Sequence, residues 1–205
     1  MLISALKQTS PERFTVLFDD GSEVKTTLTV VTDMRLFTGK ELDGGELTEL
    51  RDASALSLCK ARALNMVAKR AMSRKELVDK LTEKGEDVTY AEACAEWMVS
   101  AGFINDCEYA GMVVRHYAAK GYGMGRIRTE LIRRGISREL WDEALSEMPE
   151  QDDTLDRLLR QRLRGSFDRA DVKKASDALV RKGYGYDEIS AALRRLRVEA
   201  EDGLD

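Results

Sequence analysis

One short pattern occurs three times in this 205-residue chain at nearly equal spacing. It reads Leu-x-x-basic-Gly and ends at Gly85, Gly135 and Gly183, so that the copies are 50 and then 48 residues apart. Glycine just after a helix accepts the left-handed conformation that ends it, and helical patterns flank each copy. A period near 50 residues that contains three helices predicts units stacked along the chain.

The first 30 residues have a different pattern. Apolar residues alternate over 14–18 and again over 24–30, and Asp19, Asp20 and Gly21 lie between them. Alternation on both sides of a tight turn predicts a β-hairpin, to which a short strand near 2–6 can add. A lone hairpin is marginally stable in water, so it must pack on another element.

Helical periodicity begins after Asp33 and continues to the end of the chain. Ser73 with Glu76 and Thr89 with Glu92 have the spacing of capping boxes, and Asn105 opens a further helix. Expected helices cover about 47–70, 73–85, 89–102, 105–121, 126–135, 137–147, 154–164, 169–182 and 187–197.

The predicted fold is mainly α: three tandem three-helix repeats form an elongated curved body, preceded by a small N-terminal β-hairpin and a linking helix. The hairpin extension is expected at 1–45, the linking helix with the first repeat at 46–104, the second repeat at 105–148 and the third at 152–200. No long heptad seam is present, so we expect a monomer.

Composition excludes several classes of function. The three cysteines (Cys59, Cys94 and Cys107) and the one histidine, His116, fit no zinc-ligand spacing, and an odd cysteine count fits no disulfide framework. We expect reduced structural cysteines, no metal and no cofactor. No apolar run is long enough to span a membrane, and the N-terminus is unlike a signal peptide, so we expect a cytoplasmic protein.

No convincing active site is present, and we expect no enzymatic activity. The segment from Gly121 to Arg126 (Gly-Tyr-Gly-Met-Gly-Arg) is a weak match to a phosphate-binding loop, because it lacks the Gly-Lys-Ser/Thr ending and no strand precedes it. A glycine turn between two helices is the simpler interpretation. Tyr122, Tyr184 and Tyr186 can stack on bases or cover the edge of a core.

Basic residues are unevenly placed in a chain whose net charge is −4. Segment 115–138 holds seven Lys and Arg residues against one acid, Glu130. Many lie at helix C-termini, where they complement the helix dipole. Another set lies near helix starts, where a cation opposes the dipole: Arg74, Lys75, Arg126, Arg128, Lys173 and Lys174. This placement predicts a stripe that meets phosphates or an acidic protein surface, although a plain solvated surface is the alternative.

Three segments carry a family resemblance. Residues 70–85 are similar to R-x-x-S-x-x-E-L-x-x-K-L-x-x-K-G, residues 102–110 to G-x-[IL]-[DN]-D-x-x-[FY]-A, and residues 121–136 to G-x-G-x-x-R-I-x-x-E-L-x-x-[KR]-G-[IV]. These patterns belong to RecX, the bacterial regulatory family that restrains the RecA recombinase. The chain resembles the longer RecX proteins over nearly its whole length, with a looser match in the third repeat.

The resemblance implies a non-enzymatic negative regulator in homologous recombination, DNA repair and the SOS response. Such proteins bind the RecA filament on single-stranded DNA, in its groove or at its growing end, and inhibit extension, ATP hydrolysis and strand exchange. Weak direct binding to single- or double-stranded DNA can accompany this. The residues expected to face the filament are Arg74, Lys75, Arg115, Tyr122, Arg126, Arg128, Arg134, Lys173 and Lys174.

Three other functions are compatible with the residues. The chain could be a DNA-binding helical module that acts alone, which its net charge disfavours, or an enzyme that uses the glycine loop on a nucleotide. It could also be a helical-repeat adaptor unrelated to recombination, because fold does not determine function.

Overall fold

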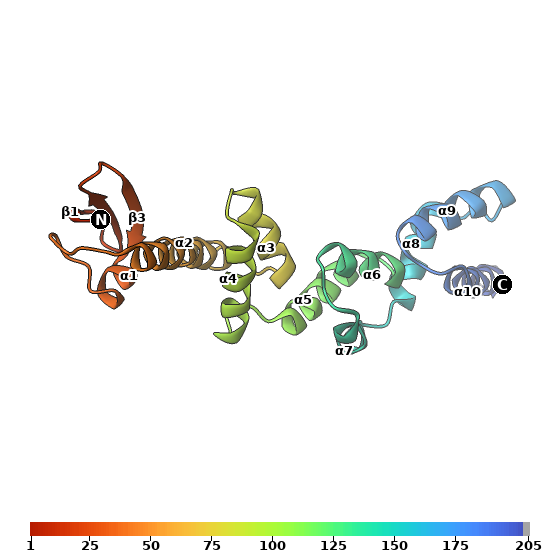
Figure 1. Cartoon of the computed structure of the whole chain (residues 1–205). Coiled ribbons are helices and arrows are strands. Elements are labelled where there is room, and N and C mark those ends of the chain that lie inside the picture. The colour runs from red at the N-terminus through yellow and green to blue at the C-terminus, as the bar shows by residue number, and fades with distance from the viewer. Residues whose placement is uncertain (203–205) are drawn as a thin grey trace. The chain divides into compact units, whose positions relative to one another are not determined.

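The computed structural model describes residues 1–202, with side chains for 1–200. The chain forms two compact units, one ending at Ile104 and the other beginning at Asn105. The first unit holds a small sheet followed by helices, and the second is helical throughout (Figure 1). The prediction of a mainly helical fold with an N-terminal β element is therefore confirmed.

The sheet has three antiparallel strands in the order β1-β2-β3: Ile3–Ser10, Arg13–Phe18 and Glu23–Thr27. Its buried face packs against a short helix, α1 (Leu28–Asp33), and the N-terminal part of α2 (Gly44–Val67). Their shared core contains Ile3, Val16, Phe18, Val30, Leu36, Leu42 and Leu50.

The sheet differs from the predicted hairpin in two ways. The short first strand suggested near 2–6 is confirmed, and it extends to Ser10. The returning strand ends at Thr27 rather than at Val30, because Leu28 already begins α1 and the Thr27 side chain accepts a hydrogen bond from the amide of Val30. Alternating apolar residues over 24–30 thus span a strand and a helix.

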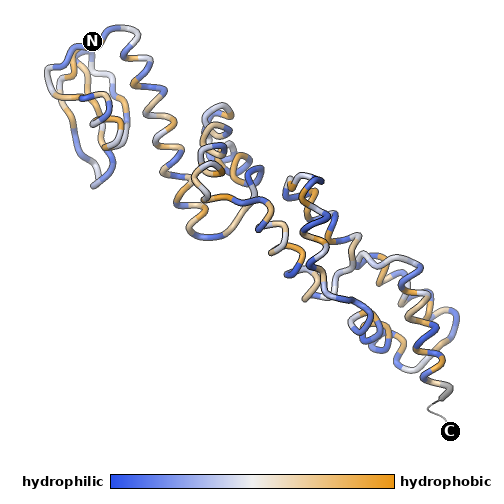
Figure 2. The backbone as a smooth tube through the Cα atoms, turned by 90° about the horizontal axis from the view of Figure 1, so that it is seen from below, coloured by the Kyte–Doolittle hydropathy of each residue, from blue (hydrophilic) through white to orange (hydrophobic). Residues whose placement is uncertain are grey.

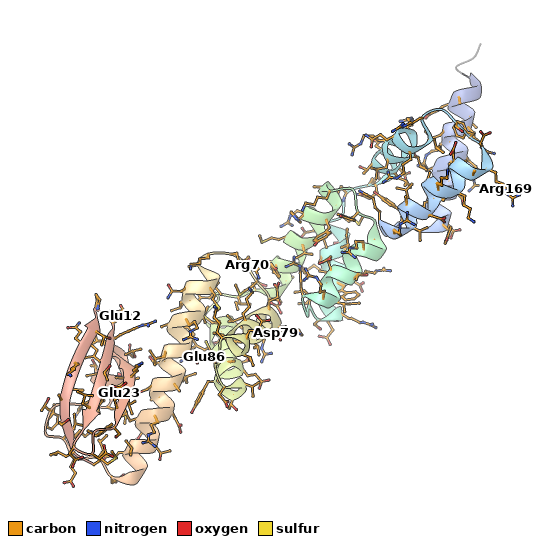
Figure 3. The ribbon with its side chains drawn as sticks, turned by 90° about the horizontal axis from the view of Figure 1, so that it is seen from above. Glu12, Glu23, Arg70, Asp79, Glu86 and Arg169 are labelled. Carbon is orange, nitrogen blue, oxygen red and sulfur yellow. The ribbon has the colours of Figure 1, made fainter. Side chains whose placement is uncertain are left out.

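The first three-helix domain consists of the C-terminal half of α2 with α3 (Arg74–Glu83) and α4 (Val88–Ser100). Ser73 and Glu76 form the predicted capping box at the start of α3. The second predicted box is wrong, because Asp87 caps α4 through the amide of Thr89 at 2.8 Å. Side chains hold the turn after α3 to α2, since Arg62 pairs with Glu86 at 2.9 Å. Figure 3 labels Glu86 in this part of the first unit.

The second unit contains two further three-helix domains. The second domain consists of α5 (Asp106–Ala119), α6 (Met124–Arg133), a 3-10 helix η1 (Arg138–Leu140) and α7 (Trp141–Ser146). The third consists of α8 (Asp152–Leu163), α9 (Arg169–Arg181) and α10 (Tyr186–Asp202). Asn105 caps α5 as predicted, through the amides of Cys107 and Glu108.

The repeated pattern occupies equivalent places in the three domains. Its leucines, Leu81, Leu131 and Leu179, are fully buried, each in the core of its own domain. Its glycines follow α3, α6 and α9 with φ values of +87°, +68° and +95°, which is the left-handed conformation expected after a helix. Apolar residues recur along these helices (Figure 2), so each domain buries its own apolar face.

Candidate functional site

Two helix ends meet within the second unit, where backbone atoms join the second domain to the third. The amide of Gly123 donates to the carbonyl of Lys182 at 3.0 Å, and the amide of Gly125 donates to the carbonyl of Gly183 at 2.9 Å. The first N–H groups and last C=O groups of a helix have no partners inside it. The start of α6 and the end of α9 therefore satisfy each other. We call these contacts of Gly123, Gly125 and Gly183 the glycine junction.

The glycine junction explains the motif that is a weak match to a phosphate loop. A phosphate loop needs free amides that point at the ligand, but the amides of Gly123 and Gly125 already donate to carbonyls of the third domain. The structure therefore favours the simpler interpretation, a glycine turn between α5 and α6.

A groove of about 600 Å³ lies beside the glycine junction, between α6 and the end of α9. Its lining residues are Met124, Gly125, Arg126, Arg128, Thr129, Val180, Arg181, Gly183, Tyr184, Gly185 and Glu188. Three of these are arginines and one is a carboxylate, Glu188, which accepts a hydrogen bond from the amide of Gly185 at 2.6 Å. The groove thus has an excess of positive charge in a chain of net negative charge.

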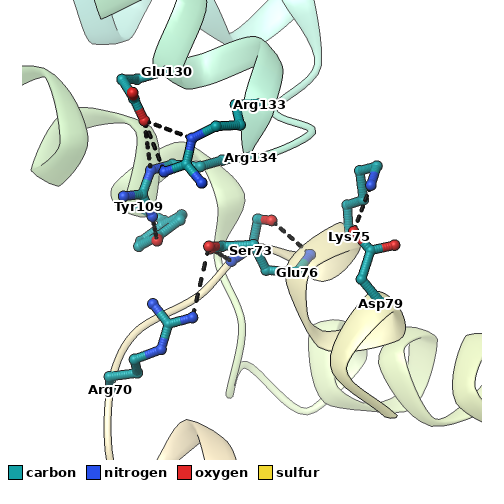
Figure 4. Close-up of polar contacts among 9 residues, drawn as sticks. All are labelled: Arg70, Ser73, Lys75, Glu76, Asp79, Tyr109, Glu130, Arg133 and Arg134. Carbon is teal, nitrogen blue, oxygen red and sulfur yellow. Dashed lines mark hydrogen bonds and ion pairs between the residues drawn. The ribbon is translucent and has the colours of Figure 1, made fainter. Parts of the chain in front are cut away.

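Glu130 organises the arginines of α6. Its side chain is 4% exposed and pairs with Arg126 at 3.1 Å. It also pairs with Arg133 at 2.8 Å, and the Nε of Arg134 lies 4.0 Å from the carboxylate (Figure 4). One carboxylate therefore serves three guanidinium groups. Because it cannot neutralise all three, this part of α6 keeps a net positive charge.

Glu130 is charged at neutral pH despite its burial. Burial alone raises the pKa of this carboxyl, but hydrogen bonds from Arg133 and Tyr117 and the charge of Arg126 outweigh it and hold the pKa below its ordinary value. The ionised form accepts these hydrogen bonds and is favoured by them. The arginines of α6 are consequently fixed by a permanent charge at physiological pH.

Two of the predicted partner-facing arginines make contacts inside the second domain. Arg134 is 16% exposed, donates to the hydroxyl of Tyr109 and lies 5.5 Å from the centre of its ring. Arg115 pairs with Glu147, which joins α5 to the residue after α7. These contacts give both arginines a structural role, and their place on a partner-binding face stays a prediction.

Arg74 and Lys75 begin α3 in the first unit, where acidic side chains offset their unfavourable position near the helix start. The Nε of Arg74 lies 3.5 Å from a carboxylate oxygen of Glu96. The Nζ of Lys75 lies 2.5 Å from a carboxylate oxygen of Asp79 (Figure 4). Both side chains remain about half exposed. They keep access to solvent, although each has an acidic neighbour.

Arg128 lies further from its helix start than predicted, and Lys173 and Lys174 lie about equally far from theirs. Arg128 is the fifth residue of α6, and Lys173 and Lys174 are the fifth and sixth residues of α9. They therefore lie in second turns, where the dipole argument is weak. Both lysines are exposed, and Lys174 lies 3.9 Å from Asp171.

The three candidate stacking tyrosines have different surroundings. Tyr122 is partly buried, with its ring 5.5 Å from that of Tyr117 and 4.9 Å from the Nζ of Lys182. Tyr184 is 3% exposed and belongs to the core of the third domain, whereas Tyr186 is 66% exposed at the start of α10. Only Tyr186 of the three has an open ring.

Two basic residues at the end of α9 have contacts that their position at a helix C-terminus did not predict. Arg181 and Lys182 fit a role as cations that complement the dipole of α9, but Arg181 also lines the groove. The Nζ of Lys182 donates to the carbonyl of Gly121 at 3.3 Å, across the two domains. Nothing in the local sequence indicated this contact, because its partners are 61 residues apart.

Two of the three cysteines lie in an apolar core. Cys59 and Cys94 are fully buried in the first three-helix domain, and burial raises the pKa of Cys59 to about 12. Cys107 is partly exposed. Within residues 1–202 no group of three or more His, Cys, Asp or Glu side chains is placed to hold a metal ion.

No helix in the described part of the chain combines the length and the apolar character that a bilayer span requires.

Comparison with known proteins gives a consistent result. Residues 59–97 match the model of the first three-helix domain of RecX, and residues 105–145 match that of the second. The regulatory protein RecX of Xanthomonas axonopodis pv. citri is 35% identical over 136 residues, which cover 65% of this chain and 84% of that protein. RecX of Bacillus licheniformis is 29% identical over 211 residues, which cover 99% of this chain and 79% of that one.

Solved structures share the fold. A crystal structure of regulatory protein RecX superposes with a TM-score of 0.77 at 22% identity, covering 94% of this chain and 98% of the other. RecX from Lactobacillus salivarius gives a TM-score of 0.65 at 26% identity, covering 71% and 99%. The tandem three-helix domains, the matched family models and these relatives agree: the chain belongs to the RecX family of regulatory proteins.

Proposed function

We propose that this protein restrains RecA without being an enzyme, by binding the RecA filament on single-stranded DNA. Bound in the filament groove or at its growing end, it inhibits extension, ATP hydrolysis and strand exchange. Family membership supports a regulatory role. Within the chain, the proposal depends on one observation, the arginine-lined groove beside the glycine junction.

The groove suits an anionic partner. Arg126 and Arg128 lie on α6 and Arg181 lies on α9, so the groove takes charge from two domains. Arginine recognises carboxylates and phosphates through paired hydrogen bonds. Arg128 is exposed, and Arg126 keeps 46% of its side-chain surface exposed although it pairs with Glu130. We infer that these two arginines contact the filament directly.

The test is ATP hydrolysis by RecA on single-stranded DNA, with this protein added below the RecA concentration. Binding of DNA by the protein alone is measured in the same salt. We expect hydrolysis to fall under conditions where the protein alone binds DNA weakly. If hydrolysis is unchanged, or falls only when the protein alone saturates the DNA, the proposal is wrong.

A double charge-reversal variant tests whether the groove is the surface that binds the filament. Arg126→Glu with Arg128→Glu should raise the concentration for half inhibition roughly tenfold or more, because hydrogen bonds to charged groups contribute about 1.5–3 kcal/mol each. Lys7→Glu with Lys25→Glu is the matched control, since both lysines are exposed on the N-terminal sheet and the net charge changes equally. Full inhibition by the arginine variant would exclude this groove.

Direct binding of single-stranded DNA is the second candidate function. The exposed ring of Tyr186 lies next to a groove-lining residue, Gly185, and an aromatic ring beside cations is typical of single-strand binding. Such binding should weaken steeply between about 50 and 200 mM salt without RecA. Tyr186→Ala should reduce it, whereas inhibition of RecA through the arginines alone should be unaffected.

A further inference from the structure

The two domains of the second unit approach each other too closely for side chains at the glycine junction. A Cβ atom on Gly123 would lie 2.5 Å from the carbonyl oxygen of Gly183. A Cβ on Gly183 would lie 2.9 Å from the carbonyl oxygen of Gly123, 2.7 Å from the Cβ of Arg126, and closer still to the Arg126 amide. These neighbours are backbone atoms or are fixed to the backbone, so they cannot rotate away.

The junction is held by few contacts besides these backbone atoms. The apolar core of the second domain and that of the third are separate clusters. Across the junction, two backbone hydrogen bonds, the Lys182–Gly121 contact and the approach of Lys182 to the Tyr122 ring join the domains. Leu158 and Thr154 of α8 lie beside Gly121. The two domains thus share no continuous apolar core, and the glycines determine how closely their backbones meet.

The same glycines determine the position of the groove. Gly125 and Gly183 line it, and the adjacent Arg126 begins its arginine set. Arg181 precedes Gly183 by two residues and reaches the groove from the other domain. Any movement at the junction therefore changes the spacing between Arg126 or Arg128 and Arg181.

We propose that Gly123 and Gly183 are positioning residues that hold the second and third domains at one fixed spacing. Through this spacing they set the register of the groove arginines toward an anionic partner. The structural part stands by itself, and the effect on RecA rests on the proposed function above. The glycines touch no partner in this proposal; they act through the arginines.

The structural part is tested by distance measurements across the junction. Nitroxide labels are attached at Ser137→Cys in the second domain and Ser190→Cys in the third, both exposed sites, in the full chain with Cys107→Ser. Cys59 and Cys94 stay unlabelled because they are buried. Pulsed electron resonance should give a narrow distance distribution for the parent, and Gly183→Ala should shift and broaden it.

Gly165→Ala is the matched control for Gly183→Ala. Gly165 lies in the third domain with φ of +85°, close to the +95° of Gly183, but a Cβ there meets nothing within 4 Å. Both variants place alanine in the left-handed region, which destabilises similarly. Only Gly183→Ala adds an obstruction between domains. Equal distance distributions for the two variants would overturn the proposal.

A second pair covers the case in which Gly183→Ala fails to fold. Gly123 has φ of −79°, so Gly123→Ala introduces no left-handed strain and only the contact with the backbone of Gly183 and Tyr184. Gly44→Ala, at the start of α2 and in open space, is its control. We expect Gly123→Ala to move the label distance while circular dichroism keeps the helix content of the parent. An unchanged distance would show that the junction tolerates a side chain.

Measuring RecA inhibition by the parent and the glycine variants tests the register role separately from the proposed function. If the parent inhibits hydrolysis, we expect Gly123→Ala to raise the half-inhibiting concentration at least fivefold and Gly44→Ala to leave it unchanged. Inhibition retained by a variant whose label distance has moved would refute the register role. No inhibition by the parent would refute the proposed function instead, and the distance result would still decide the structural part.

Discussion

The equivalent helices α3 and α6 begin in opposite ways. Ser73 and Gly123 both lie eight residues before the leucine of the repeat, and Glu76 and Arg126 both lie five before it. At the start of α3, the Ser73 and Glu76 side chains satisfy the free amides in a capping box. At the start of α6 no side chain caps the helix, and carbonyls of the third domain accept instead.

The two helices therefore differ in where their N-terminal amides find acceptors. In the first three-helix domain, side chains of the same domain accept hydrogen bonds from the amides at the start of α3. In the second domain, the amides at the start of α6 donate to backbone carbonyls of the third domain. An arginine can then stand at position 126, where the first domain needs a glutamate, because the carbonyl end of α9 offsets the positive end of α6. Because α6 needs no glutamate at position 126 for a capping box, Arg126 can occupy this position and line the groove.

The largest expected effect comes from giving α6 the serine N-cap that α3 has. Gly123→Ser supplies a good N-cap residue, yet we expect the second unit to lose stability by roughly 1–3 kcal/mol, as overpacking does. The reason is the 2.5 Å approach of its Cβ to the Gly183 carbonyl. Urea unfolding followed by Trp141 fluorescence in a Trp97→Phe background measures it. Greater stability would show that α6 needs only a cap.

The next largest effect concerns Glu130, for which the first domain has Lys80 at the equivalent position. Because its pKa is lowered in the folded protein, its contribution is present above the unfolded pKa and is lost as pH falls through the folded one. Glu130→Gln should lower the free energy of unfolding by about 1.5 kcal/mol at pH 7, in the range of hydrogen bonds to charged groups. The free energy of unfolding of this variant should also fall less than that of the parent as the pH is lowered.

The measurement is unfolding of the second unit from pH 7 to pH 3, with Trp141 as the probe. Glu76→Gln is the control, since it changes the charge equally but lies in the first unit. If the free energy of unfolding falls as steeply toward low pH in Glu130→Gln as in the parent, another carboxyl causes the decrease.

The smallest effect is expected at the first domain's own cap. Ser73→Ala removes an acceptor that lies 3.0 Å from the Glu76 amide and should cost about 1 kcal/mol. The loss should appear in the unfolding of the first unit, reported by Trp97 in a Trp141→Phe background. A loss of this size seen by Trp141 in the Trp97→Phe background would contradict the assignment of this cap to the first domain.

The sequence predicted the features that depend on local chemistry. The repeat glycines, the Ser73 box and the Asn105 cap could be recognised because each is determined by residues within one turn. The strand ending at Thr27 was missed because alternation continues into α1. Residue pattern alone does not distinguish a strand from a short helix there.

The candidate site was predictable only in part. The cationic character of α6 follows from counting residues, and Arg126 and Arg128 line the groove. The inward contact of Arg134 with Tyr109 and the meeting of Gly123 with Gly183 depend on distant parts of the chain. The glycines were visible in the sequence, but their spacing could not indicate that backbone from another domain occupies the place of their side chains.

The long helix α2 contributes to two cores at once. Leu50 near its start is buried with the sheet, and Cys59 and Ala63 further along are buried in the first three-helix domain. No joint interrupts the 24 residues from Gly44 to Val67. Opening either core would expose one end of a continuous hydrogen-bonded rod, so amide exchange should be slow along its whole length. We therefore expect the sheet and the first three-helix domain to unfold as one cooperative unit.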